Sequence, residues 1–229
     1  MTFTVLLYAL QLYADFSGGI DVSRGIAQIL GIEMAENFRR PYFSKSINEY
    51  WRRWHITLGA WMKEYIFYPL SLSSTFLTAS KKMKATKFGA TQAGAHIAKV
   101  LPTAFASLIV FLIVGVWHGA SWKYVVFGLW NGGVIMLSIL MKPLFDGALK
   151  KLHINPNNFF WRLFQMLRTF VIVCIGYVFD IAPSFRQAMW TFKMILTRQS
   201  ISHILAKIFS LGITEKDLII LVVAAFVVF

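Results

Sequence analysis

The chain has 229 residues, of which 57% are hydrophobic and 14% are charged, and its mean hydropathy is +0.60. A soluble domain carries roughly 25% charged residues, so this chain cannot cover a water-facing surface of ordinary composition. One cysteine (Cys174) excludes an internal disulfide framework, and 15 glycines with 6 prolines exclude a collagen-like chain. The composition predicts an all-α, polytopic integral membrane protein, whose 16% aromatic residues suit interfacial belts.

The charge balance is strongly basic, with 23 Lys and Arg residues against 10 Asp and Glu residues, a formal net charge of +13. In a soluble protein this excess would suggest a nucleic-acid partner. In so apolar a chain, basic loops more simply orient the protein against the cytoplasmic leaflet. We therefore expect membrane lipid as a partner and no nucleic acid.

The first segment, residues 1–35, is expected to begin as a helix. Its apolar run Met1–Ala14 is shorter than the roughly 20 residues that cross a bilayer, and Asp15 follows it directly. At the other end, the apolar residues 218–229 are also too few to cross. Both ends thus fall inside hydrophobic segments, and we expect the chain to be part of a larger polytopic protein.

An amphipathic helix is predicted over residues 45–66. Ser46 and Glu49 have the spacing of a capping box, which marks a helix start. Apolar residues then recur at steps of three and four: Ile47, Tyr50, Trp51, Trp54, Leu58, Trp61, Met62 and Tyr65. This tryptophan-rich face is suited to the membrane interface or to packing on the spans, and Pro69 is expected to help end the helix.

The membrane spans are predicted at residues 100–117, 122–141 and 167–182, with 218–229 as a truncated span. Basic loops are expected over 71–99 and 142–166, and an amphipathic segment over 185–210. The basic clusters before the first span and after the second are separated by two crossings, so they lie on one side, which the positive-inside rule makes the cytoplasm. The turn at residues 118–121 then faces the outside.

His118 is the leading candidate for chemistry because it stands at the junction of two spans. Burial keeps an imidazole neutral, and a neutral histidine is what a general base must be. Trp117 and Trp122 flank the turn and are placed to exclude water. The alternative is a histidine that only hydrogen-bonds a carbonyl at the helix end.

His55 lies at the edge of the tryptophan-rich face, where by itself it is best interpreted as an interfacial histidine. Trp54, Trp117, Asp15 and Asn131 are further candidates, for lining a substrate channel, although hydrogen bonds between helices are the commoner role of polar groups in membranes. The sequence has no phosphate-binding loop, nucleophile elbow or His-x-x-x-His spacing, so no metal site and no bound cofactor are expected.

Three sequence blocks, taken together, resemble the membrane-bound O-acyltransferase family: residues 13–21 (YADFSGGID), 36–58 (ENFRRPY running into YWRRWHITL) and 115–122 (GVWHGASW). The resemblance covers about residues 5–135 and is greatest to the bacterial branch of alginate O-acetylation and teichoic-acid D-alanyl transfer proteins. Beyond Leu70 the basic stretch departs from the alginate-type pattern. Family members are longer, and the resemblance implies that this chain corresponds to part of their C-terminal half.

The resemblance implies a partial helical ring around a thinned centre, in the inner membrane of a bacterium. It implies that His118 is catalytic and that His55 is the second histidine of the branch. The donor would be acetyl-CoA or another acyl thioester on the cytoplasmic side, the acceptor a hydroxyl of a cell-envelope polysaccharide, and the external partner an SGNH-type acyltransferase.

Three alternatives stay open at this point. The first is D-alanyl transfer from a carrier protein to teichoic acid. The second is a transporter in which His118 and Asp15 relay protons, which would predict interrupted helices in two related halves. The third is a non-catalytic scaffold.

Overall fold

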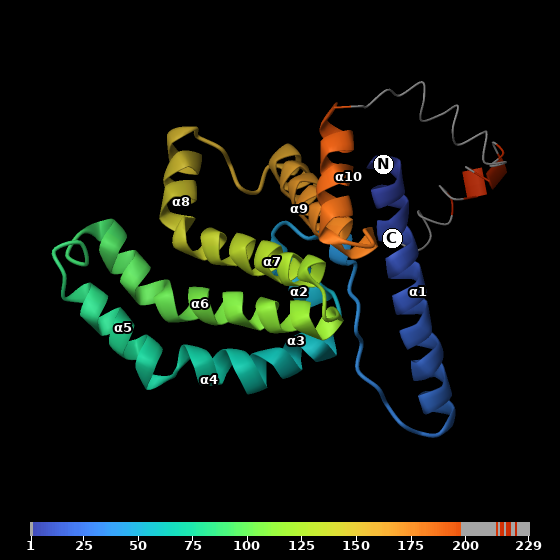
Figure 1. Ribbon diagram of the computed structural model, residues 1–229, viewed down its shortest axis with the longest axis horizontal. Coiled ribbons are helices and arrows are strands. Elements are labelled where there is room, and N and C mark those ends of the chain that lie inside the picture. Colours follow the sequence, from blue (N-terminus) through green and yellow to red (C-terminus); the bar gives the residue numbers. More distant parts are fainter. Residues whose placement is uncertain (1, 198–213, 215, 218, 221–222, 224–229) are drawn as a thin grey trace. The chain divides into compact units, whose positions relative to one another are not determined.

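The computed structural model describes residues 2–197, 214, 216–217, 219–220 and 223 (Figure 1). Apart from one isolated bridge between Phe38 and Trp54, the regular structure of the described residues is helical, so the all-α prediction is confirmed. Residues 198–210 of the predicted amphipathic segment, and most of the predicted span at 218–229, lie outside the described residues.

Contacts divide the chain into two compact units, residues 36–176 and residues 1–35 with 177–229. The helices in chain order are α1 (Thr2–Ile29), a 3₁₀ turn (Pro41–Phe43), α2 (Ile47–Arg53), α3 (Ile56–Met62), a π-helical turn (Lys63–Phe67), α4 (Tyr68–Ser71), α5 (Ser74–Lys84), α6 (Gln92–His118), α7 (Trp122–Leu140), α8 (Lys142–Lys151), α9 (Phe159–Ile181) and α10 (Phe185–Thr197).

The centre of the larger unit is the hairpin of α6 and α7, which run side by side (Figure 1). Glycines bring the two backbones together. A Cβ on Gly115 would collide with the carbonyl oxygen of Tyr124, and one on Gly128 with that of Phe111. In lipid, where helices gain little from apolar burial, close packing through small residues is a principal source of helix association.

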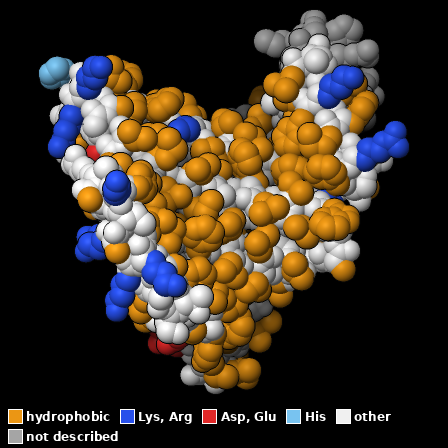
Figure 2. Space-filling model, turned by 60° about the vertical axis from the view of Figure 1, so that its left-hand side comes forward, with side chains coloured by type: hydrophobic (Ala, Val, Ile, Leu, Met, Phe, Trp, Pro, Cys, Tyr) orange, Lys and Arg blue, Asp and Glu red, His pale blue; other side chains and the backbone are white. Residues whose placement is uncertain are grey.

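Within the described part of the chain, three helices are long and apolar enough to cross a membrane: α6, α7 and α9. They lie at the three predicted spans, but α6 begins at Gln92 and α9 at Phe159, earlier than the apolar runs themselves. Each presents large apolar side chains outward, such as Val116 (61% exposed) and Phe160 (75%). Figure 2 shows apolar side chains over much of one face, with Lys and Arg mostly toward its edges. Such a surface suits lipid.

The two predicted basic loops are partly helical, which corrects their assignment. The first contains α5, whose start is capped by the Ser73 hydroxyl, and the second contains α8, with Pro143 in its first turn where proline is tolerated. Lysines end both helices, where they complement the helix dipole. Both segments are rich in lysine and were therefore predicted to be loops rather than helices.

Residues 45–66 do not form the single continuous helix that was predicted. Its start is as expected, because the Ser46 hydroxyl accepts a hydrogen bond from the Glu49 amide. The helix breaks after Arg53, however, and α3 begins only at Ile56. Pro69 does not end it either: it lies in the first turn of α4, which continues to Ser71.

The smaller unit contains α1, the end of α9 and α10. The Tyr8 hydroxyl donates a hydrogen bond to Asp180, and its ring lies edge-on to Tyr177 at 5.6 Å between centroids. Phe179 packs against Phe192 of α10. Asp15 lies on α1 with an exposed side chain.

Candidate functional site

His55 lies at the break between α2 and α3, with backbone angles φ 47° and ψ 56°. This left-handed conformation is uncommon for a residue other than glycine and persists only where its surroundings hold it. The surroundings here are residues 37–39, which we call the strap. The Arg39 amide donates to the Arg53 carbonyl at 3.0 Å, and the Ile56 amide donates to the Asn37 carbonyl at 3.0 Å.

The strap also buries aromatic side chains against the break. Trp54 is 7% exposed, stacks on Tyr50 and meets Phe38 edge-on at 5.0 Å. Tyr50 is 1% exposed. The strap and this aromatic cluster fix both sides of the break, so the side chain of His55 projects from a rigid turn rather than from the edge of a continuous helix.

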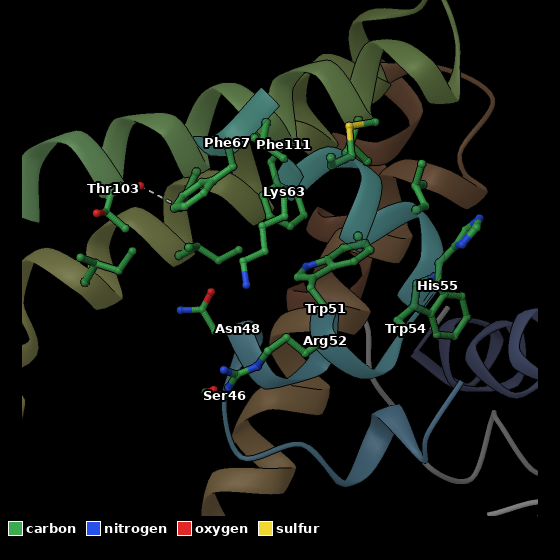
Figure 3. Close-up of a pocket in the computed structure, with 18 residues that line it drawn as sticks. Ser46, Asn48, Trp51, Arg52, Trp54, His55, Lys63, Phe67, Thr103 and Phe111 are labelled. Atoms are coloured by element: carbon green, nitrogen blue, oxygen red, sulfur yellow. Dashed lines mark hydrogen bonds between the residues drawn. The ribbon is translucent and has the colours of Figure 1, made fainter. Parts of the chain in front are cut away.

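A cavity of about 560 Å³ lies beside this break, with His55 in its wall (Figure 3). That volume is within the range of small-molecule sites. The far wall is α6 from Thr103 to Val114, a rise of about 16 Å, with Ile135 and Ile139 of α7. The cavity is thus an elongated, mostly apolar space along the hairpin.

Polar and basic groups gather at one part of this cavity. In Figure 3, Asn48, Arg52 and Lys63 lie on one side of Trp51, and His55 and Trp54 lie on the other. A guanidinium and an ammonium group beside an apolar channel suit a ligand with an anionic head and an uncharged arm.

Burial lowers the pKa of His55 below its ordinary value of 6.5, and the neighbouring His118 lowers it further, although a backbone hydrogen bond opposes the shift. His55 is therefore held as a neutral imidazole at physiological pH.

His118 is the last residue of α6, and it is exposed in this chain. Its ring stacks at 5.9 Å on Tyr124 and lies edge-on to Phe127 at 5.2 Å. Phe127 also contacts Trp51, which lines the cavity. His118 itself is not among the described residues that line the cavity, and Phe127 connects it to Trp51 in the cavity wall.

Gly119 shapes the turn that follows His118. Its φ of 154° is unfavourable for other residues, and a Cβ there would approach the Tyr124 ring at 2.8 Å. Glycine at this position therefore allows the Tyr124 ring to stack on His118. This is a specific reason for the Trp-His-Gly order in the sequence.

The predicted channel residues occupy different environments. Trp54 lines the cavity. Asn131 is 2% exposed, and its amide oxygen accepts a hydrogen bond from the Trp51 indole at 3.2 Å, which links α7 to α2. Trp117 is 57% exposed and Trp122 77% exposed, so within this chain these two rings do not enclose His118 as expected. Asp15 belongs to the other unit.

Sequence reasoning missed four residues of this site: Asn37, Trp51, Arg52 and Lys63. Asn37 lies in the block that carried the family resemblance but was given no role. The other three residues lie within the predicted helix over residues 45–66. The break at His55 could not be predicted there, because the apolar residues keep their three- and four-residue spacing on both sides of the break. Among the described residues, no three His, Cys, Asp or Glu side chains group as around a metal ion.

The family model for the membrane-bound O-acyltransferases matches residues 1–88 and 97–177. The chain is 31% identical over 200 residues to the peptidoglycan O-acetyltransferase of Helicobacter pylori, covering 87% of this chain and 32% of that protein. It is 29% identical over 193 residues to the "Probable alginate O-acetylase AlgI" of Azotobacter vinelandii (82% and 32%). It is 29% identical over 177 residues to the teichoic acid D-alanyltransferase of Bacillus subtilis (77% and 40%).

The chain thus spans between about a third and two fifths of the length of these three relatives. The matched residues include both histidines, the strap and the α6–α7 hairpin from residue 97 onward. The chain is a member of the membrane-bound O-acyltransferase family.

Proposed function

We propose that this protein transfers an acyl group, most simply acetyl, from a thioester donor to hydroxyls of a cell-envelope polysaccharide. The observation that carries the proposal is an elongated apolar cavity that has His55 in its wall and runs along α6, the helix that ends at His118. Family membership supplies the reaction class.

In the proposed reaction His118 is the general base. Its imidazole takes the proton of the acceptor hydroxyl while the oxygen attacks the thioester carbonyl. The carbon–sulfur bond then breaks, and the same proton passes from His118 to the departing thiolate, so that the histidine ends neutral as it began. A positioned base of this kind is worth ~10²–10⁴ in rate.

The cavity along α6 is the proposed site of the donor arm. Its apolar wall would exclude water from the thioester, and Arg52 and Lys63 would neutralise an anionic part of the donor. His55, in the wall of the same cavity, would orient the acceptor hydroxyl. Acetyl-CoA, which carries phosphates on an uncharged arm, has this chemical character.

The proposed setting is the inner membrane of a bacterium, crossed more than once. The lysine-rich ends of α5 and α8 would face the cytoplasm, by the positive-inside rule, and His118 would face outward. An SGNH-type acyltransferase on the outer side is the proposed protein partner.

The test uses His118→Ala, expressed in native cells that lack the chromosomal copy. We expect alkali-labile acetate in the envelope polysaccharide to fall to the level of the deletion strain, while the amount of protein in the membrane is unchanged. The matched control is His153→Asn, since His153 is exposed and its φ of 51° is one that asparagine tolerates. Normal acetylation by His118→Ala would reject the base assignment.

D-alanyl transfer is the second candidate, supported by the similarity to the teichoic acid D-alanyltransferase of Bacillus subtilis. Mass analysis of the alkali-released acids from the same cells separates the two candidates. Loss of acetate alone supports acetyl transfer, and loss of D-alanine alone supports the second candidate.

A further inference from the structure

Asn37 is a buried polar residue of the strap, 7% exposed, whose side chain reaches the break at His55. Its amide oxygen, Oδ1, accepts a hydrogen bond from the Thr57 backbone amide at 3.1 Å and from the Thr57 hydroxyl at 2.7 Å. The same oxygen lies 3.2 Å from Nδ1 of His55. One side-chain oxygen thus contacts both His55, which precedes α3, and Thr57 in its first turn.

The Thr57 amide settles which end of the Asn37 side chain faces the break. A backbone N–H can only donate, so the atom that faces it must be the oxygen and not the nitrogen of the Asn37 amide. An oxygen of this kind can only accept. The hydrogen bond to His55 therefore requires that Nδ1 carry a proton.

We propose that Asn37 is a positioning residue that holds His55 as the Nδ1–H tautomer, so that the proton-accepting lone pair of its imidazole is on Nε2. The tautomer follows from the geometry of the strap. Its kinetic consequence rests on the function proposed above, in which His55 orients the acceptor hydroxyl, here by accepting its hydrogen bond at Nε2. Fixing the tautomer through the other ring nitrogen is a general way to prepare a histidine for chemistry.

A purely structural role is the competing explanation, because Asn37 also bonds Thr57 and its backbone carbonyl bonds Ile56. Loss of activity in Asn37→Ala cannot separate the two explanations. Asn37→Asp can, because aspartate keeps an accepting oxygen at the same place but adds a negative charge beside Nδ1.

The charged groups around His55 come from several elements. In and beside the strap, Glu36 pairs with Arg39, and Arg40 follows. On α2, Arg53 pairs with Glu49, and Arg52 lines the cavity. Lys63 comes from the π-helical turn, and His118 from the end of α6. All of them are present in both the parent protein and Asn37→Asp. A difference between the two proteins therefore reports the new carboxylate.

The first experiment measures the tautomer without any assay of function. The protein is labelled with ¹⁵N-histidine, and the His55 signals are assigned by their absence from His55→Gln. We expect a protonated Nδ1 and an unprotonated Nε2 at neutral pH, and a loss of this preference in Asn37→Ala. A protonated Nε2 in the parent protein would overturn the inference.

The second experiment measures the pH dependence of transfer from [¹⁴C]acetyl-CoA to alkali-labile product in membranes of producing cells. Asn37→Asp should move the acid limb to higher pH by about one unit, because an adjacent carboxylate favours the imidazolium. Asn37→Ala should lower the rate about tenfold or more. An unshifted acid limb in Asn37→Asp, at normal protein abundance, would overturn the inference.

The two experiments fail in different ways. If the tautomer is as proposed but neither protein transfers the label, the proposed acetyl donor is wrong and the positioning of His55 stands. If transfer is normal but the tautomer is reversed, the positioning is wrong and the function stands. Should Asn37→Ala not accumulate in the membrane, Asn37→Asp and the parent spectrum still decide the inference.

Discussion

The two histidines of this protein lie on regions that are built in different ways. His118 ends α6, in a hairpin whose helices meet through glycines at van der Waals distance. His55 lies at a break that is held by hydrogen bonds from the strap. In the hairpin, glycines without side chains let the two helix backbones pack closely. At the break, hydrogen bonds from buried polar atoms hold the backbone in place. Steric changes should therefore damage the first region and polar changes the second.

The largest effect on stability is expected at the helix contact of the hairpin. In Gly128→Ala the new methyl group meets the Phe111 carbonyl, a backbone atom that cannot move aside. We expect a loss of about 1–3 kcal/mol and a lower melting temperature of the detergent-purified protein. Gly133→Ala is the control on the same helix, because a Cβ there meets nothing within 4 Å. Equal melting temperatures for the two variants would contradict the account of the hairpin.

A smaller, local effect is expected at the turn after His118. Gly119→Ala strains a backbone at φ 154° and pushes the Tyr124 ring away from the imidazole. We expect acyl transfer to fall roughly tenfold while membrane abundance is unchanged. The control, Gly147→Ala on α8, has open space for its Cβ and should keep full activity. Full activity of Gly119→Ala would show that the stacking of Tyr124 on His118 does not contribute to acyl transfer.

A loss of about 1 kcal/mol is expected where the two regions are joined. Trp51→Phe removes the indole donor to the buried oxygen of Asn131 but keeps an aromatic ring among Phe111 and Phe127. Thermal unfolding should show a modest decrease relative to Trp61→Phe, a matched change at a ring that is 50% exposed. The reverse order of stability would contradict the proposed α2–α7 link.

The smallest effect at neutral pH comes from the titration of His55. Because its pKa in the folded protein is lower than 6.5, the unfolded chain binds its proton first as the pH falls. Stability should therefore be complete above about pH 6.5 and should decrease below it, down to the pKa of the folded state. Melting temperatures of the parent protein and His55→Gln, measured from pH 8 to pH 5, should converge as the pH falls. A constant difference would show that His55 does not titrate.

The sequence was sufficient to predict the hairpin but not the break. Apolar runs on both sides of His118 mark α6 and α7, because hydropathy reports the length that lipid demands. The capping pair Ser46 and Glu49 likewise marks the start of α2. The break at His55 has no local signal: it depends on Asn37, 18 positions earlier in the chain, which the spacing of apolar residues cannot register.

Two tryptophans to which the sequence analysis gave the same role lie in different environments. Trp54 and Trp117 were both expected to line a channel, but one is buried against the strap and the other is exposed at the end of α6. A tryptophan at either position gives the same hydropathy pattern. Only the packing of residues distant in sequence decides which ring meets the cavity.

The central claim is that these two differently built regions bring their histidines to one reaction. The most direct test measures acyl transfer in His118→Ala, His55→Ala and the double variant, each corrected for membrane abundance. Residues that act as a unit give losses that do not add, so the double variant should be no less active than His118→Ala alone. Because His118→Ala alone is expected at the level of the deletion strain, the contradicting result is a His55→Ala variant as active as the parent protein, which would show that His55 takes no part in the reaction.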